Sequence, residues 1–274
     1  MEEAVVSRKS ILIVVLFSLI VSGVIFFKNY LFDNSFIVFC DVGQGDATYI
    51  RLPNGFDVMV DVGPDRKVLS CLGKFMPFYD KTIELVFISH PQKDHFGGFD
   101  EVLNRYKVKN IFMNLVNNKS SSYSSLLNKI NNKKILIKKF TTGDKIIIYN
   151  AKFLSLWPNK IFEMGIKDLN KISIVIEFTI NNKKILFTGD VDKKTLESLI
   201  NILSKVNILK VPHHGSKNSL SKKFYYKIKP DISIIHVGKN NAYGLPSQDV
   251  LKILKQIKSD VKRTDKEGNI KINL

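Results

Sequence analysis

The sequence SHPQKDHFGG, residues 89–98, directly follows the apolar run Ile83–Ile88, which predicts a short buried strand. Two imidazoles and a carboxylate, from His90, Asp94 and His95, therefore lie on a loop that leaves the tip of a strand. Imidazole nitrogens and carboxylate oxygens are common zinc ligands, and side chains this close in sequence can converge on one cation. The loop predicts a metal site.

Three further groups of polar side chains fall at the ends of expected strands. Asp190 ends the run FTGD, His213 and His214 lie in the run VPHHGS, and Asp61 follows the run VMV. Strand ends hold side chains rigidly while the adjoining loops give access to them. These loops and the first one together contain four of the five histidines of the chain, which favours one shared metal site.

The composition fits a folded protein with a basic surface. The chain has 274 residues, enough for one large domain or two modest ones, and its hydrophobic content of 45% supplies a sizeable core. Lys and Arg number 42 against 25 Asp and Glu, which gives a net charge of +17. Such a surface suits nucleic acid, a phosphate-rich polymer or lipid headgroups. A general bias toward Lys, Asn and Ile is the alternative explanation.

The N-terminal segment Ile11–Phe27 contains no charged residue. At 1.5 Å per residue it comes close to spanning a hydrocarbon core of about 30 Å, which predicts a membrane anchor. Arg8 and Lys9 precede the segment and only Lys28 closely follows it, which predicts a cytoplasmic N-terminus and a domain outside. A cleaved signal peptide is the alternative, but no small-residue cleavage pattern follows the segment.

The two cysteines, Cys40 and Cys71, are too far apart in sequence to form a metal-binding pair. Cys40 lies in an apolar run, which predicts a small buried side chain without a partner. A disulfide between the two cysteines is the alternative for a domain outside the cytoplasm.

Short strands and helices alternate after the anchor, which predicts an α/β (α+β) layered sandwich. We expect a stub, anchor and linker over residues 1–34, with the linker around 29–34, and one domain over 35–274. The tail Val261–Leu274 predicts a hairpin around Gly268. Strands are expected at 35–40, 47–52, 57–60, 83–88, 109–114, 134–140, 145–149, 152–156, 173–180, 183–188, 209–211 and 231–237, and helices at 65–76, 99–106, 122–131 and 247–258.

Five motifs together resemble one known family. SHPQKDHFGG is similar to the histidine-aspartate motif of metallo-β-lactamase fold hydrolases. With DVGQGD, FTGD, KVPHHGSKNS and GKNNAYGLP, it resembles the lactamase-like domain of the bacterial DNA-uptake (competence) protein ComEC, over about Phe36 to Leu274. The chain shows one apparent spanning segment in place of the many-helix channel of ComEC, so the resemblance implies a stand-alone relative of that domain.

The resemblance implies a four-layer αββα sandwich with one or two divalent ions, zinc or manganese. It implies a hydrolase, in this branch a phosphodiesterase or nuclease that acts on DNA by metal-activated hydroxide. Together with the anchor segment, it predicts a single-pass protein of the bacterial cytoplasmic membrane, and the resemblance adds the DNA-uptake machinery as a candidate partner.

Individual residues take roles through their match to the family motifs. His90, Asp94, His95, Asp190 and His213 match metal ligands, and Asp94 or Asp190 would orient the attacking water. The residues expected to support the ligands, or to replace one, are His214, His236, Asp61 and Asp46; Asp41 and Gln44 complete the DVGQGD match. The residues expected to hold substrate phosphates or shape the loops are Lys210, Ser216, Lys217, Lys239, Asn241 and Tyr243.

Two positions depart from the family pattern. Gln92 stands where a His or Asp usually follows the first His, and Leu245 stands where a His usually precedes the Pro. Neither side chain is a good zinc ligand. A catalytically inactive domain that binds DNA or a protein partner is therefore one alternative function, and hydrolysis of another phosphoester is a second. We hypothesise that His236 partly replaces the missing ligand, against the simpler role of a locally hydrogen-bonded strand residue.

Overall fold

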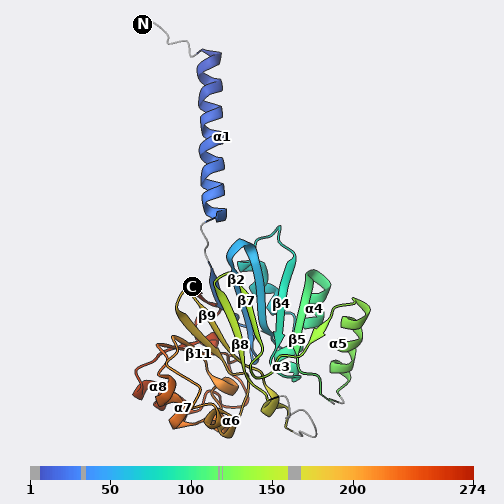
Figure 1. The fold of residues 1–274 in the computed structure, drawn as a ribbon, viewed down its shortest axis with the longest axis vertical. Helices are drawn as coiled ribbons and strands as arrows, with labels where there is room; N and C mark the ends of the chain where they lie inside the picture. Colours follow the sequence, from blue (N-terminus) through green and yellow to red (C-terminus); the bar gives the residue numbers. More distant parts are fainter. Residues whose placement is uncertain (1–6, 32–34, 117, 119, 160–167) are drawn as a thin grey trace.

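Two seven-stranded sheets stacked face to face form the centre of the molecule (Figure 1). The computed structural model describes residues 7–31, 35–116, 118, 120–159 and 168–274. The first sheet contains β1 (Phe36–Phe39), β2 (Ala47–Leu52), β3 (Phe56–Val62), β4 (Thr82–Ile88), β5 (Lys107–Met113), β6 (Ile137–Lys138) and β14 (Ile270–Asn273), in the order β14-β1-β2-β3-β4-β5-β6. The second contains β7 (Lys145–Ile148), β8 (Ala151–Trp157), β9 (Val175–Ile180), β10 (Lys183–Phe187), β11 (Ile208–Lys210), β12 (Ile232–Ile235) and β13 (Asp260–Arg263), in the order β13-β12-β11-β10-β9-β8-β7.

Helices cover the outer face of each sheet, which gives the four-layer αββα arrangement. The helices of the described residues are α1 (Arg8–Leu31), α2 (Val68–Phe75), α3 (Lys93–Phe96), α4 (Phe99–Arg105), α5 (Ser121–Asn132), α6 (Lys193–Ser198), α7 (Lys222–Ile228), α8 (Gln248–Gln256) and α9 (Thr264–Glu267). Helix α1 covers neither sheet and projects away from the domain (Figure 1). Leu72, Val102 and Ile130 of α2, α4 and α5 share one buried cluster with the first sheet. Residues of α6, α7 and α8 share another with the second sheet. The expected α/β sandwich is confirmed.

The strands bury both faces because their side chains alternate between two apolar layers. In β1, Phe36 and Val38 point toward the helices, whereas Ile37 and Phe39 point into the layer between the sheets. That central layer is rich in stacked rings: the centroids of Phe153 and Phe178 lie 4.4 Å apart. This layer holds the two sheets together, and the packing of the sheets determines which strand ends lie close to one another.

The expected C-terminal hairpin is wrong. β13 pairs in parallel with β12 in the second sheet, whereas β14 pairs antiparallel with β1 in the first. Helix α9 and Gly268, with a φ of +69°, carry the chain across from one sheet to the other. The expected strand at 134–140 shrinks to Ile137–Lys138, and α3, α6 and α7 were not predicted because four to seven residues give too little helical periodicity.

The predicted burial of Cys40 is confirmed, but the expectation that it has no partner is wrong, and the alternative disulfide is found. Cys40 and Cys71 form a disulfide, with their Cα atoms 5.7 Å apart. Cys40 follows β1 and Cys71 lies on α2, and both are buried. The bond ties the start of the loop that carries Asp46 to the helix layer, a pairing that only the tertiary structure brings within reach.

Helix α1 covers and extends the predicted anchor segment, and it includes residues 29–31 of the expected linker. Its large apolar side chains from Ile11 to Val24 are mostly exposed. Across the described residues, we find no helix that combines the length and the apolar character needed to cross a membrane. Residues 1–6 of the expected stub and 32–34 of the expected linker lie outside the described residues.

The strand directions give the domain two distinct ends. β1 and β2 are antiparallel, β2 and β3 are antiparallel, and β3 and β4 are parallel. β1, β3 and β4 therefore all start at the end where the chain arrives from α1. Asp46 after β1, Asp61 near the end of β3 and His95 on α3 after β4 all lie at the opposite end.

Candidate metal centre

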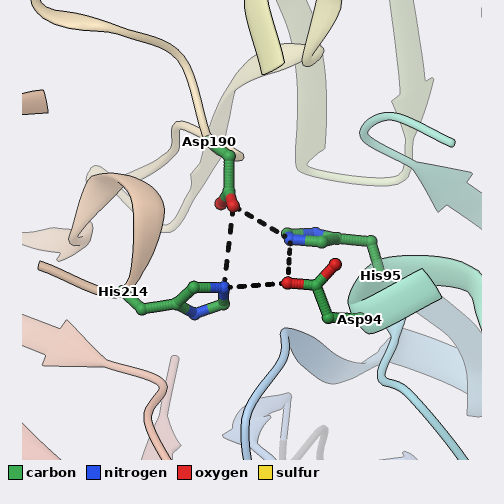
Figure 2. A group of neighbouring side chains, drawn as sticks. All are labelled: Asp94, His95, Asp190 and His214. Atoms are coloured by element: carbon green, nitrogen blue, oxygen red, sulfur yellow. Dashed lines mark hydrogen bonds and ion pairs between the residues drawn. The ribbon is translucent and has the colours of Figure 1, made fainter. Parts of the chain in front are cut away.

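Four side chains from loops far apart in sequence converge at that opposite end: Asp94, His95, Asp190 and His214 (Figure 2). The Nε2 atom of His214 lies 3.3 Å from Asp94 Oδ2 and 3.6 Å from Asp190 Oδ2. The Nε2 atom of His95 lies 3.3 Å from Asp190 Oδ2 and 3.8 Å from Asp94 Oδ2. One ligand atom of each residue lies within 4.8 Å of the others, so the four could surround a single cation.

Tight backbone turns deliver these side chains. Asp94 and His95 lie on the one-turn helix α3, and Asp190 follows Gly189, whose φ is +49°. A Cβ atom at Gly189 would lie 2.7 Å from the Cβ of Ser173, so a larger residue would displace the loop. The hydroxyl of Ser173 accepts a hydrogen bond from the backbone N–H of Asp190 at 3.1 Å. No sequence motif pointed to Ser173.

His213 and His214 also occupy left-handed backbone conformations, with φ values of +50° and +53°. For residues other than glycine this conformation costs about 1–2 kcal/mol each. Such strain is found at functional sites, where the surrounding structure holds it in place. The turn directs the His214 ring toward Asp94 and Asp190.

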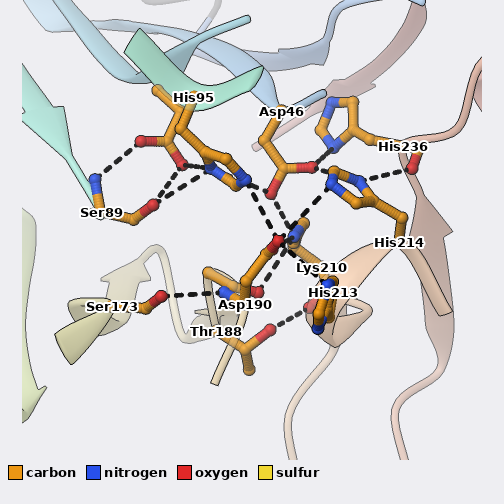
Figure 3. Close-up of polar contacts among 12 residues, drawn as sticks. Asp46, Ser89, His95, Ser173, Thr188, Asp190, Lys210, His213, His214 and His236 are labelled. Atoms are coloured by element: carbon orange, nitrogen blue, oxygen red, sulfur yellow. Dashed lines mark hydrogen bonds and ion pairs between the residues drawn. The ribbon is translucent and has the colours of Figure 1, made fainter. Parts of the chain in front are cut away.

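The second ring nitrogen of each imidazole is held by a supporting group (Figure 3). His95 Nδ1 lies 2.9 Å from Asp61 Oδ2, and Asp61 also accepts hydrogen bonds from the N–H and hydroxyl of Ser89. His214 Nδ1 lies 3.0 Å from the carbonyl oxygen of His236 and 3.2 Å from Asp46 Oδ1. Metal-binding histidines are commonly oriented in this way. Asp61 and Asp46 thus lie where residues that order the ligands are expected.

Several polar atoms at the centre are buried without a hydrogen-bond partner among the described residues. They include His95 Nε2 and both carboxylate oxygens of Asp190, together with His90 Nε2. A buried polar group without a partner costs about 1–3 kcal/mol, and more when it is charged. A divalent cation would satisfy these atoms, so the residues present fit a metal ion.

The charges in the site also favour a cation. Burial alone would lower the pKa of His95, but the carboxylates of Asp190, Asp61 and Asp46 outweigh it and raise that pKa well above its usual value. His214 behaves in the same way, and its pKa rises to about 9. Burial favours a protonated Asp190, but the neighbouring cations hold the pKa of its carboxyl well below the usual range. Protons on the two imidazoles and on Lys210 thus balance the charge of the carboxylates.

We expect metal binding to release about two protons per ion at pH 7, one each from His95 and His214, because a metal displaces protons from its ligands. Both pKa values are raised, so the competing protons are present at pH 7. The proton of His214 leaves as the pH rises through about 9. Metal affinity should increase over that range. Calorimetric titration in two buffers of different ionisation enthalpy measures the proton count. An affinity that does not change between pH 7 and 9 would contradict this account.

His90 and His213 lie beside the four-residue group but outside it. His90 is buried with its ring centroid 4.2 Å from that of His95, and burial lowers its pKa to about 4. His213 Nε2 lies 3.8 Å from Asp190 Oδ2, and burial lowers the pKa of its ring as well. Both rings are therefore neutral and able to bind metal. The structure places His214, rather than the expected His213, in the group with Asp94.

Two other sequence-predicted residues lie behind the site. Lys210 was expected to hold substrate phosphates, but its side chain is buried and its ammonium forms an ion pair with Asp46. The Nζ atom of Lys210 lies 3.5 Å from Asp190 Oδ1. His236 was hypothesised to replace a ligand, but its Nε2 lies 3.0 Å from the carbonyl oxygen of Ala47 and its Nδ1 3.4 Å from Asp46 Oδ1. Both residues surround Asp46 instead of joining the four-residue group.

The comparisons with known proteins agree on a fold and a group of relatives. No family model matches the chain. It is 28% identical over 249 residues to ComE operon protein 3 of Bacillus subtilis, covering 84% of this chain and 32% of that protein. It is 27% identical over 237 residues to Recombination protein 2 of Haemophilus influenzae, covering 85% and 28%. The chain thus spans about a third of the length of these relatives.

Solved structures establish the fold. The metallo-β-lactamase fold protein YhfI of Bacillus subtilis aligns with a TM-score of 0.59 at 11% identity, covering 88% of this chain and all of that one. A diphosphatase of the PhnP family aligns with a TM-score of 0.54 at 13% identity, covering 87% and 98%. This chain has the metallo-β-lactamase fold and resembles the ComEC-like proteins. The resemblance drawn from its motifs is confirmed.

The two residues that depart from the metallo-β-lactamase pattern, Gln92 and Leu245, have structural positions. Gln92 directly precedes α3, and its backbone begins that helix. Its side chain is not part of the four-residue group. Leu245 packs against the apolar cluster beneath α8. Asn241, expected to contact substrate, instead binds the backbone of Leu245 and Gly238.

The other side chains that we expected to contact substrate differ in their exposure and in their contacts with other residues. Ser216 accepts a hydrogen bond from the N–H of Asn218, and the exposed Lys217 forms an ion pair with Asp249 at 3.3 Å. Lys239 and Tyr243 are exposed on the loop that precedes Leu245. Lys239 and Tyr243 are therefore the two of this set best placed to meet a substrate.

Proposed function

We propose that this chain is a metal-dependent phosphodiesterase that cleaves DNA, anchored in a membrane through α1. The observation that carries the proposal is the convergence of Asp94, His95, Asp190 and His214, with their buried polar atoms facing one another. The fold is that of the metallo-β-lactamase hydrolases. His90 and His213 stand beside Asp190 as candidate ligands for a second ion.

A bound divalent metal would lower the pKa of water and neutralise phosphodiester oxygens as negative charge builds on them. Asp94 is the accessible member of the group, with a side chain 32% exposed. Burial tends to raise the pKa of its carboxyl, but the hydrogen bond with His214 and the charge of His95 lower it below the usual value. Asp94 is therefore ionised and placed to accept a proton from, or orient, the attacking water.

DNA is the proposed substrate for three reasons. The net charge of +17 suits a polyanion, and Lys239 is exposed three residues after His236, whose ring contacts Asp46. Two relatives carry names that refer to the ComE operon and to recombination. A structural neighbour is a diphosphatase, which supports phosphoester chemistry on this fold. A role in a DNA-uptake machinery is part of the same proposal.

We place the domain outside the cytoplasm of a bacterial cell. The Cys40–Cys71 disulfide supports this location, because disulfides persist in oxidising compartments. The exposed apolar side chains of α1 from Ile11 onward, preceded within the helix by Arg8 and Lys9, support a membrane anchor with the N-terminus inside.

A second candidate function is binding of DNA or a protein partner without catalysis. Gln92 and Leu245 favour it, because each stands where the family usually places a ligand. The two functions differ in metal content and in turnover.

The test uses the full-length chain in detergent or nanodiscs, loaded with zinc or manganese. We expect bound metal by elemental analysis, cleavage of labelled single- or double-stranded DNA, and a rate that falls with salt because phosphate contacts release counterions. Asp190→Asn is the control and should lose both metal and cleavage. DNA binding without metal or cleavage would establish the second candidate. Bound metal with hydrolysis of a small phosphodiester but not of DNA would point to another phosphoester substrate.

A further inference from the structure

Exposed aromatic side chains gather at the end of the domain opposite the metal centre. Among the described residues 35–274, five aromatic side chains are exposed, and three of them lie on turns at that end. Phe78 and Tyr79, on the turn before β4, are 86% and 66% exposed. Tyr149, on the turn between β7 and β8, is 57% exposed. We define Phe78, Tyr79 and Tyr149 as the aromatic end.

Strand directions place all three residues at the end of the domain where the chain enters β1 from α1. β4 runs in parallel with β3 and in the direction of β1, so the turn before β4 lies where Phe36 begins. β10 ends at the metal centre, and β8 runs with it through two antiparallel pairings, so the turn before β8 lies at the far end as well. The ammonium of Lys183, at the start of β10, donates to the carbonyl of Asn273 and joins the two sheets there.

The turn that exposes Phe78 and Tyr79 is held in place. Asp80 N–H donates to the carbonyl of Pro77 at 2.9 Å, and the Asp80 carboxylate lies 3.3 Å from the guanidinium of Arg51. Arg51 also pairs with the buried Asp57 at 2.7 Å. The two exposed rings therefore project from a structured support, with their centroids 5.5 Å apart.

Membrane interfaces favour this combination of side chains. Aromatic rings settle at headgroup level, and lysines nearby are attracted to anionic headgroups. Lys81 follows the aromatic turn, and Lys107 pairs with it at the start of β5 through a backbone hydrogen bond; both lysines are exposed. From Leu31 at the end of α1 to Phe36, five residue steps reach at most about 18 Å. The last residue of α1 therefore stays within that distance of Phe36, which lies at the same end of the domain as the aromatic end.

We propose that the aromatic end docks on the surface of a lipid bilayer and holds the metal centre on the side that faces away from it. The proposal rests on the membrane anchoring included in the proposed function. Docking at two points, the anchor and the aromatic end, would fix the tilt of the domain, which a linker of a few residues alone would leave free. The metal centre would then open toward the aqueous phase from which a polyanionic substrate arrives.

The test places a tryptophan at the aromatic end of the full-length chain, reconstituted into vesicles that contain brominated lipid. Phe78→Trp is the test variant and Tyr226→Trp, exposed on α7, is the matched control. The native Trp157 is the last residue of β8, at the end of that strand nearer the metal centre, and donates to the carbonyl oxygen of Lys171; it serves as an internal reference. We expect Phe78→Trp to lose roughly half of its added emission, because a ring at the headgroup level lies near the acyl chains. Tyr226→Trp and the wild type should change little.

Flotation of the same vesicles separates the two proposals. A chain that floats, with quenching of Phe78→Trp that grows with anionic lipid and weakens with salt, supports docking. A chain that floats with no more quenching in Phe78→Trp than in Tyr226→Trp overturns docking and leaves the anchor standing. A chain that does not float overturns both, while DNA cleavage remains a separate measurement. Tyr149→Trp replaces Phe78→Trp if that variant does not fold.

Discussion

Asp190→Asn will weaken metal binding by roughly 100-fold or more, the largest effect that we expect from any single substitution. Three candidate ligands lie around Asp190: its Oδ2 lies 3.3 Å from His95 Nε2, 3.6 Å from His214 Nε2 and 3.8 Å from His213 Nε2. Both of its oxygens are buried without a hydrogen-bond partner among the described residues. The amide keeps the shape of the carboxylate but removes the charge that a cation requires.

The measurement is calorimetric metal titration of the full-length chain, with thermal unfolding to confirm the fold. Asp192→Asn is the matched control, because it makes the same change two residues away on the same loop. Asp192 caps α6 by accepting from the N–H of Thr195, and Asn caps helices as well as Asp does. Retained metal affinity in a folded Asp190→Asn chain would show that the ion, if any, lies elsewhere.

His214→Asn will weaken metal binding by roughly 100-fold, whereas His213→Asn will weaken it by less than about 10-fold. The reason is geometric: His214 contacts both Asp94 and Asp190, whereas His213 approaches Asp190 alone and is partly exposed. Both residues have φ near +50°, which asparagine tolerates better than most residues, so the pair of variants differs little in backbone cost.

Side-by-side titrations of the two variants decide between the histidines. A larger loss in His213→Asn would restore the ligand assignment made from the sequence motif. Equal losses would indicate that both rings bind, which fits two ions that share Asp190. A second plateau in the titration of the wild type would then be expected.

The sequence predicted β1 to β5 of the first sheet well because their residues alternate between two apolar layers. Ala47–Leu52 is an example, and its bounds agree with those of β2. It predicted the C-terminal hairpin wrongly, because the chain around Gly268 looks like a turn whichever strands it connects. Local periodicity contains no information on which of two sheets a strand joins.

The candidate site divides in the same way. The sequence by itself brought together the types of residue that a metal requires, since Asp94, His95, Asp190 and the pair His213-His214 all follow expected strands. Only the tertiary structure decided that His214 faces Asp94, that Lys210 and His236 surround Asp46, and that Cys40 meets Cys71. The spacing of residues in a motif shows which loop carries a ligand, because residues close in sequence stay close in space. The direction of a side chain at a left-handed turn, and its distance from a residue a hundred positions away, depend on how the two sheets pack.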